Sequence, residues 1–265
     1  MTGSDVLENL AQALAHGQIR VLDLTETLSP SFPIIQIPPE FGQPSPFVKQ
    51  VISQYDERGP LSYWNNFTVS EHTGTHFDAP IHWVTGKDLK DNAVDTINPA
   101  RFLAPACVID CSREVAANRD FLLTKNVLLA WEEQHGRIPA GSWVLMRSDW
   151  RKIADPANYT NIDDKGAHSP GPDAEAVLWM IEERDVLGFG TECIGTDAGQ
   201  AFFMDPPFPC HHYMHGAGKF GLQCLTNLDL LPPKGALIVA APLKIEQGSG
   251  SPLRVIALVP QNEGA

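Results

Sequence analysis

Three histidines and an aspartate lie within the eleven residues 72–82 of this chain, at His72, His76, Asp78 and His82. Neutral imidazole and carboxylate groups are ligands that suit Zn, Mn and Fe ions. All four residues occupy even-numbered positions, so in an extended strand their side chains would point to the same side. We therefore predict a metal site with His72, His76 and Asp78 as ligands. His82 lies beyond Pro80 and is expected to stand beside the metal.

The backbone of this segment must bend for its ligands to share one ion. In a straight strand, His72 and His76 would lie about 13 Å apart, at roughly 3.3 Å per residue. Gly74 lies midway between them and can adopt the positive φ that bends or bulges a strand. A zinc-protease helix is rejected, because Thr73 follows the first histidine where that motif has Glu. The remaining alternative is a polar loop in which the histidines only form hydrogen bonds.

A second group of polar residues lies between positions 205 and 229. Histidine is the usual metal ligand and proton carrier, so each histidine of this group is a candidate for the site or for an ordinary surface position. Thr196 and Asp197 are candidates for the rim of the site, although Asp197 more simply caps a turn. The group contains His211, His212, His215, Gln223, Asn227 and Asp229.

Three aromatic residues, Trp64, Phe67 and Trp83, flank the histidine-rich segment. An aromatic wall beside a polar metal suits a planar organic substrate. The same residue types are equally good core material, so packing is the alternative. We predict these three residues as the substrate-binding wall.

Length, charge and cysteine usage limit the function classes. The chain has 265 residues and a formal net charge of −13, without a basic stripe, which argues against nucleic-acid and anionic-membrane partners. No apolar run approaches the roughly eighteen residues of a membrane span. The five cysteines include no C-x-x-C pair, which fits reduced, packed thiols in the cytoplasm. Residues 248–252 lack the Lys of a phosphate loop and predict a tight turn, and neither a serine-hydrolase elbow nor a dinucleotide fingerprint occurs.

Hydrophobic periodicity predicts an α/β or mixed β/α protein, organised as a single domain over residues 1–265. A Pro-rich stretch, residues 28–46, predicts a structured loop beside a binding site. Ser4 is the expected N-cap of the first helix and Thr124 of the second. Helices are expected at 5–15, 124–134 and 173–184, and strands at 21–24, 64–70, 107–110, 143–146, 237–241 and 255–259.

Residues 72–82 resemble the signature of the metal-dependent cyclase family, which includes kynurenine formamidases and isatin hydrolases. Residues 225–232 and 241–254 extend the resemblance over most of the chain. Residues 168–172, 195–201 and 206–209 are more similar to the isatin hydrolase branch.

The resemblance implies a swivelling β/β/α fold, usually in a homodimer or higher homo-oligomer. It implies metal binding by His72, His76 and Asp78, and an acid/base role for His82. Related formamidases add a second metal through a His and a Glu, whose positions correspond here to His211 and Gln223. A neutral amide is a weaker ligand than a carboxylate, so we expect one Mn²⁺ per subunit, with Zn²⁺ as the alternative.

The implied reaction is the hydrolysis of isatin, a small planar cyclic amide, to isatinate by metal-activated water. His82 is the expected general acid/base, and His211 is expected to orient water or relay protons. The alternatives are hydrolysis of N-formylkynurenine, hydrolysis of a small lactone, and a non-enzymatic protein that binds an aromatic acid through its metal.

Overall fold

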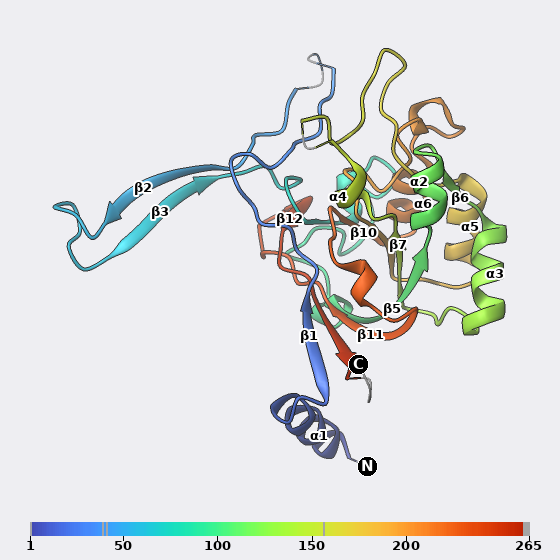
Figure 1. Cartoon of the computed structure of the whole chain (residues 1–265), viewed down its shortest axis with the longest axis horizontal. Helices are drawn as coiled ribbons and strands as arrows, with labels where there is room; N and C mark the ends of the chain where they lie inside the picture. Colours follow the sequence, from blue (N-terminus) through green and yellow to red (C-terminus); the bar gives the residue numbers. More distant parts are fainter. Residues whose placement is uncertain (1, 39, 41, 156, 262–265) are drawn as a thin grey trace.

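A curled nine-stranded sheet organises the residues that the computed structural model describes, which are 2–38, 40, 42–155 and 157–261 (Figure 1). Pro39 and Phe41 of the Pro-rich stretch lie outside these residues. The strand order is β1-β13-β11-β5-β7-β9-β10-β4-β12. Strands β5, β7, β9 and β10 run parallel, and the strands on both sides of them pair antiparallel. The predicted α/β class is confirmed.

The described strands of this sheet and of two small two-stranded sheets have the following bounds. They are β1 (Ile19–Asp23), β2 (Val48–Gln54), β3 (Tyr63–Thr68), β4 (His76–Asp78), β5 (Leu103–Asp110), β6 (Leu122–Leu123), β7 (Trp143–Arg147), β8 (Gly171–Pro172), β9 (Gly188–Thr191), β10 (Phe220–Gln223), β11 (Lys234–Val239), β12 (Gly250–Pro252) and β13 (Ile256–Pro260). The sequence located the strands near β1, β3, β5, β7, β11 and β13 but not the remaining ones.

The α-helices are α1 (Gly3–Ala15), α2 (Ser112–Ala117), α3 (Lys125–His135), α4 (Trp150–Ile153), α5 (Ala174–Glu182) and α6 (Pro209–Gly216). Short 3-10 turns are η2 (Pro80–His82), η3 (Pro99–Phe102), η4 (Ala201–Phe203) and η5 (Leu228–Leu230). None of the described helices is both long and apolar enough to cross a membrane.

Strand β7 is buried on both faces, as expected for a central parallel strand. Trp143 and Leu145 point into one apolar cluster, whereas Val144 and Met146 point into a second cluster that includes side chains of α3, α5 and α6. This alternation follows from the two-residue period of a strand. Helices α3, α5 and α6 therefore cover one face of the sheet, and Figure 1 shows them on its right-hand side, away from α1.

One of the two predicted N-caps, Ser4, is wrong, and the other, Thr124, is confirmed as the N-cap position. Helix α1 is capped by Thr2 rather than Ser4, because the Thr2 hydroxyl accepts from the Asp5 amide and the Asp5 carboxylate accepts from the Thr2 amide. This reciprocal pair satisfies two amides at the helix start, which Ser4 inside the first turn cannot do. Thr124 does precede α3, but its side chain makes no capping hydrogen bond.

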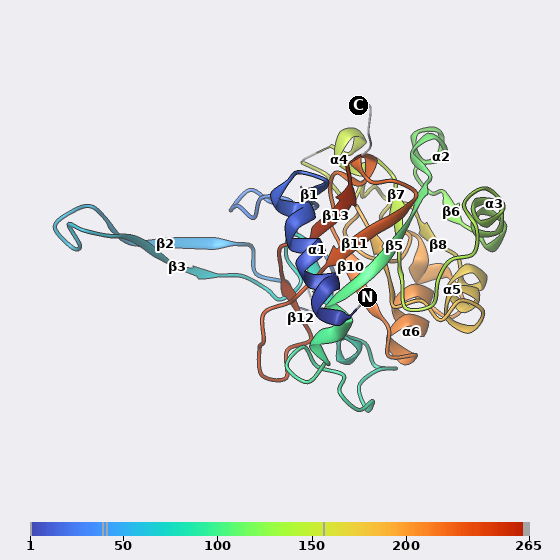
Figure 2. The ribbon, with the colours of Figure 1, turned by 90° about the horizontal axis from the view of Figure 1, so that it is seen from below.

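Strands β2 and β3 form a hairpin that projects from the body of the protein, and both views show it as an extended arm (Figures 1 and 2). We call this segment, residues 48–68, the arm. It pairs with no strand of the nine-stranded sheet. Tyr63, Trp64 and Phe67 of the arm are exposed.

Residues 248–252 do not form the predicted simple turn. Gly250, Ser251 and Pro252 form β12, which pairs antiparallel with β4 at the edge of the sheet. Strand β4 is fully buried and therefore needs hydrogen-bonding partners on both sides, which β10 and β12 supply.

The loop before β8 is held by His168, whose ring contacts Asp120 at 2.8 Å and Asp163 at 3.1 Å. The hydrogen bonds that the His168 ring donates to Asp120 and to Asp163 raise the pKa of His168 above its ordinary value, against the opposing effect of desolvation. The folded state therefore holds the proton on His168 more tightly than the unfolded state does.

We predict that His168→Asn destabilises the protein more at low pH than at high pH. The raised pKa means that the stabilisation is fully present below the unfolded pKa, about 6.5, and is lost as pH rises through the folded pKa. Both aspartates are exposed, so the effect is small. Thermal unfolding at about pH 5.5 and about pH 8.5 measures it. An equal loss at both values, or the same profile in a His212→Asn control, would contradict the assignment.

Candidate metal centre and active site

The predicted bend in the histidine-rich segment is present. Gly74 has a φ of 74°, and only His76–Asp78 form a strand, so that His72 lies in a turn before β4. The rings of His72 and His76 are 5.3 Å apart between centroids, far closer than in a straight strand. The bend therefore brings both imidazoles to the carboxylate of Asp78.

Asp78 occupies the centre of this cluster and is completely buried. Glycines stand opposite it on both neighbouring strands, Gly221 on β10 and Gly250 on β12. A Cβ atom at Gly221 would lie 2.7 Å from the Asp78 Oδ2 atom, so no larger residue fits there. Burial alone would raise the pKa of Asp78, but the neighbouring His76 and His72 hold it well below its usual value.

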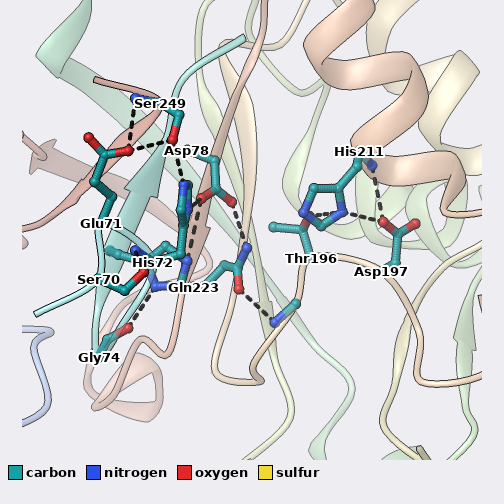
Figure 3. Close-up of polar contacts among 12 residues, drawn as sticks. Ser70, Glu71, His72, Gly74, Asp78, Thr196, Asp197, His211, Gln223 and Ser249 are labelled. Carbon is teal, nitrogen blue, oxygen red and sulfur yellow. Dashed lines mark hydrogen bonds and ion pairs between the residues drawn. The ribbon is translucent and has the colours of Figure 1, made fainter. Parts of the chain in front are cut away.

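Gln223 of β10 fixes the other side of the carboxylate. Its Nε2 atom donates to Asp78 Oδ2 at 2.6 Å, and its Oε1 atom accepts from the Gly195 amide at 2.6 Å (Figure 3). The Asp78 carboxylate can only accept a hydrogen bond, and the Gly195 backbone N–H can only donate one. These two partners therefore determine that the nitrogen end of the Gln223 side chain faces Asp78. Gln223 therefore presents a donor rather than a metal ligand toward Asp78.

The surroundings of His76 show how well these residues fit a cation. The His76 Nδ1 atom donates to the Gly74 carbonyl at 2.8 Å, which leaves the Nε2 lone pair of the neutral ring free. That Nε2 atom is buried, has no hydrogen-bond partner among the described residues, and lies 3.4 Å from Asp78 Oδ1. A lone pair facing a carboxylate oxygen in a dry site is unfavourable unless a positive charge lies between them. These residues fit a divalent ion.

Two groups of potential ligands meet at Asp78 among the described residues. In the first group, ligand atoms of His72, Asp78 and His82 lie within 4.8 Å of one another. In the second group, the same holds for Asp78, His211 and His215. The structure thus adds His82 and two residues of α6 to the neighbourhood of the carboxylate.

His82 stands beside the predicted ligands, in the turn η2. Its ring stacks on His72 with a centroid distance of 3.9 Å and an interplanar angle of 28°. Burial, together with the nearby His72, His211 and His215, lowers the pKa of His82 to about 2, despite the charge of Asp78. The ring is therefore neutral at ordinary pH.

Helix α6 contributes His211 and His215 from one face, because residues four apart lie one turn apart on the same side of a helix. Their ring centroids are 5.5 Å apart, and both lie within 6 Å of the His82 ring. Burial lowers the pKa of His215 to about 4, and its Nε2 atom has no hydrogen-bond partner among the described residues. His212 instead lines a surface cleft of about 380 Å³ with Thr85 and Tyr213.

Asp197 holds both His211 and the start of α6. Its carboxylate accepts from His211 Nδ1 at 2.5 Å and from the amides of Cys210 and His211 (Figure 3). Burial acts to lower the pKa of His211, but the hydrogen bond and charge of Asp197 outweigh it and raise that pKa above the ordinary value. Asp197 therefore caps the start of helix α6 rather than the predicted turn, and it also orients the imidazole of His211.

The three predicted wall residues lie in two different places. The Trp83 ring lies 4.8 Å from the His211 ring and 5.7 Å from the Phe208 ring, at the metal centre. Trp64 and Phe67 lie on the arm and are 57% and 61% exposed. The structure therefore joins only Trp83 to the cluster within one chain.

Two site residues were not identified from the sequence. His211 and His215 were candidates, and their four-residue spacing would have placed them on one face, had a helix been expected there. The contact between Ser249 and His72 spans 177 positions and leaves no local signal. Glu71, which bonds to Ser249, was likewise missed.

Comparison with known proteins gives the class to which this fold and site belong. A family model described as "Putative cyclase" matches residues 22–198. The chain belongs to this cyclase family.

Within the family, the similarity to isatin hydrolases covers almost the whole chain. The isatin hydrolase of Roseibium aggregatum is 51% identical over 263 residues, which are 98% of this chain and 100% of that protein. A crystal structure of an isatin hydrolase bound to the product analogue thioisatinate is 50% identical, with a TM-score of 0.96 over 98% of this chain and 100% of that one. The kynurenine formamidase of Erythrobacter litoralis is 28% identical over 90% of this chain and 94% of its own length. The expected cyclase-like fold and family are confirmed.

Proposed function

We propose that this protein is a metal-dependent amide hydrolase that converts isatin to isatinate. The observation that carries the proposal is the unpartnered, buried Nε2 atom of His76 facing Asp78, next to a neutral His82 and the Trp83 ring. Identity of about half to isatin hydrolases over nearly the full chain supports this choice of substrate.

His72, His76 and Asp78 would hold one divalent ion, for which we propose Mn²⁺ with Zn²⁺ as the alternative. When bound, such an ion polarises a carbonyl group and lowers the pKa of water. Gln223 argues for a single ion, because its donor end faces Asp78 and its oxygen is bonded to Gly195.

In the proposed reaction, a water oxygen forms a bond to the amide carbonyl carbon of isatin, and the carbon–nitrogen bond of the ring breaks. His82 accepts the proton from the attacking water and returns a proton to the leaving nitrogen. His211, held by Asp197, orients water or relays protons at the same site. Trp83 provides an aromatic surface for the planar ring.

A formamidase acting on N-formylkynurenine is the second candidate, since it would cleave a linear amide with the same groups. The kynurenine formamidase relative favours it, at lower identity than the isatin hydrolases. The identity of residue 223 favours isatin as the substrate, because the resemblance to formamidases implies a Glu that binds a second metal at this position, and this chain has Gln223 there.

We propose that the chain acts as one domain in the reducing cytoplasm. The sheet that holds the site includes both β1 and β13, from opposite ends of the chain. All five cysteines are free and buried. Burial raises the pKa of Cys107 to about 11 and of Cys111 to about 12, so these thiols are packed rather than reactive.

We also propose a homodimer or higher homo-oligomer in which the arm of one subunit packs on a second copy. An isolated two-stranded hairpin with exposed aromatic residues is marginally stable in water. A complementary row of aromatic residues leads outward from Trp83 through Phe208 to the exposed Phe202. Trp64 and Phe67 would then contact the substrate of the neighbouring subunit.

The first prediction concerns the substrate. Metal-stripped protein reconstituted with Mn²⁺ should consume isatin, followed as loss of its absorbance, and Zn²⁺ should support a different rate. N-formylkynurenine serves as the matched comparison substrate. Turnover of N-formylkynurenine without turnover of isatin would transfer the proposal to the formamidase, and tight binding of isatin without product would indicate a binding protein.

The second prediction separates the metal ligands from the proton carrier. His76→Ala should lose bound metal and activity together, since it removes an imidazole that faces Asp78. His82→Ala should keep its metal and lower turnover about 10²–10⁴-fold, the usual contribution of a general acid/base. Metal content and kcat measure the two effects, with His212→Ala as control. A metal-free His82→Ala protein would refute the assigned role.

The third prediction tests the arm. The double variant Trp64→Ser with Phe67→Ser should dissociate toward the 29.0 kDa single chain and lose affinity for substrate, as light scattering and KM would show. Leu61→Ser, at the exposed tip of the arm, is the matched control and should leave the mass unchanged. A wild-type monomer, or a double variant with unchanged mass, would disprove the packing of the arm on a second copy.

A further inference from the structure

A chain of hydrogen bonds connects the predicted turn at 248–250 to the metal centre. Ser249 Oγ donates to Glu71 Oε2 at 2.5 Å, and the Ser249 amide donates to the same oxygen at 3.1 Å. The Ser249 hydroxyl lies 2.8 Å from His72 Nε2, and His72 Nδ1 lies 2.8 Å from Asp78 Oδ1 (Figure 3). The proposed reaction does not use Glu71 or Ser249.

The Glu71 carboxylate, at one end of this series of hydrogen bonds, determines which group donates in each bond. The Glu71 carboxylate can only accept, so the single hydroxyl proton of Ser249 is directed to it. Ser249 can then interact with His72 only as an acceptor, which requires a proton on His72 Nε2. The Asp78 carboxylate, 2.8 Å from Nδ1, also only accepts, so without an ion Nδ1 carries a proton as well. Nδ1 can act as a metal ligand when an ion replaces that proton, while Nε2–H still donates to Ser249.

The ring of His72 has little freedom to leave this arrangement. A Cβ atom at Gly250 would lie 2.6 Å from His72 Cε1, so the backbone of β12 touches one edge of the ring. His82 stacks on its face at 3.9 Å. The segment 248–250 therefore shapes the position of a ligand on another part of the chain.

We propose that Glu71 and Ser249 are positioning residues that keep His72 in its Nε2–H form, so that Nδ1 is available as a metal ligand. The inference rests on the proposed metal-dependent function. Hydrogen-bond partners of this kind typically contribute about 10–100-fold to metal affinity.

The test uses variants that change which group donates in the hydrogen bond between Ser249 and His72. Glu71→Leu removes the acceptor, which frees the Ser249 hydroxyl to donate to His72 Nε2, so that Nε2 loses its proton. Glu71→Gln retains an acceptor oxygen of the same size and should preserve the wild-type form. Ser249→Ala removes the partner of Nε2. The control is Ser70→Ala, because the Ser70 hydroxyl accepts from the His72 backbone amide at 3.3 Å and does not touch the ring.

Two measurements on the full chain are needed. Nitrogen NMR of ¹⁵N-histidine-labelled, metal-free protein should show a proton on His72 Nε2 in the wild type, Glu71→Gln and Ser70→Ala, and an unprotonated Nε2 in Glu71→Leu. Titration with Mn²⁺, followed by electron paramagnetic resonance of the free ion, should show affinity reduced about 10–100-fold in Glu71→Leu and Ser249→Ala only.

An unprotonated His72 Nε2 in the wild type, or wild-type Mn²⁺ affinity in both Glu71→Leu and Ser249→Ala, would overturn the proposal. An equal loss of affinity in Ser70→Ala would also overturn it, because a general disturbance of the turn would then explain the result. The NMR measurement needs neither substrate nor metal, so failure of the isatin assay and failure of this inference are distinguishable.

Discussion

The buried carboxylate of Asp78 is the constraint on which the rest of the site depends. A fully buried charge is costly unless it is hydrogen-bonded and neutralised. Gln223 donates to one carboxylate oxygen, and His72 and His76 face the other oxygen, where a bound ion would neutralise the charge. Even the neighbouring strands conform to Asp78, because a side chain at Gly221 would collide with it.

Local chemistry made much of this centre predictable. The even-numbered positions of His72, His76 and Asp78 placed their side chains on one side, and Gly74 supplied the bend, since a positive φ is readily adopted only by glycine. Strands β5 and β7 and helices α3 and α5 were predictable for a similar reason, because their hydrophobic patterns are clear. Trp83 could be expected near the site because it adjoins His82.

Long-range packing made the remainder unpredictable. Strand β12 lacks a hydrophobic pattern, and only its pairing with β4 makes residues 250–252 extended. The contacts of Asp197 with His211 and of Ser249 with His72 join residues that no local period relates. Trp64 and Phe67 illustrate the opposite problem, since closeness in sequence to His72 does not bring them to the site of the same chain.

That closeness in sequence has another consequence. Strand β3 of the arm ends at Thr68, and three residues separate it from His72. In the proposed oligomer, ordering of the arm by a second subunit would fix the direction in which the chain enters the turn that holds His72, and ordering of that turn by an ion would fix the base of the arm. The proposed assembly and metal binding would then be linked equilibria, each promoting the other by the same coupling free energy. Dilution of the subunits would weaken metal binding, and chelation of the metal would weaken assembly.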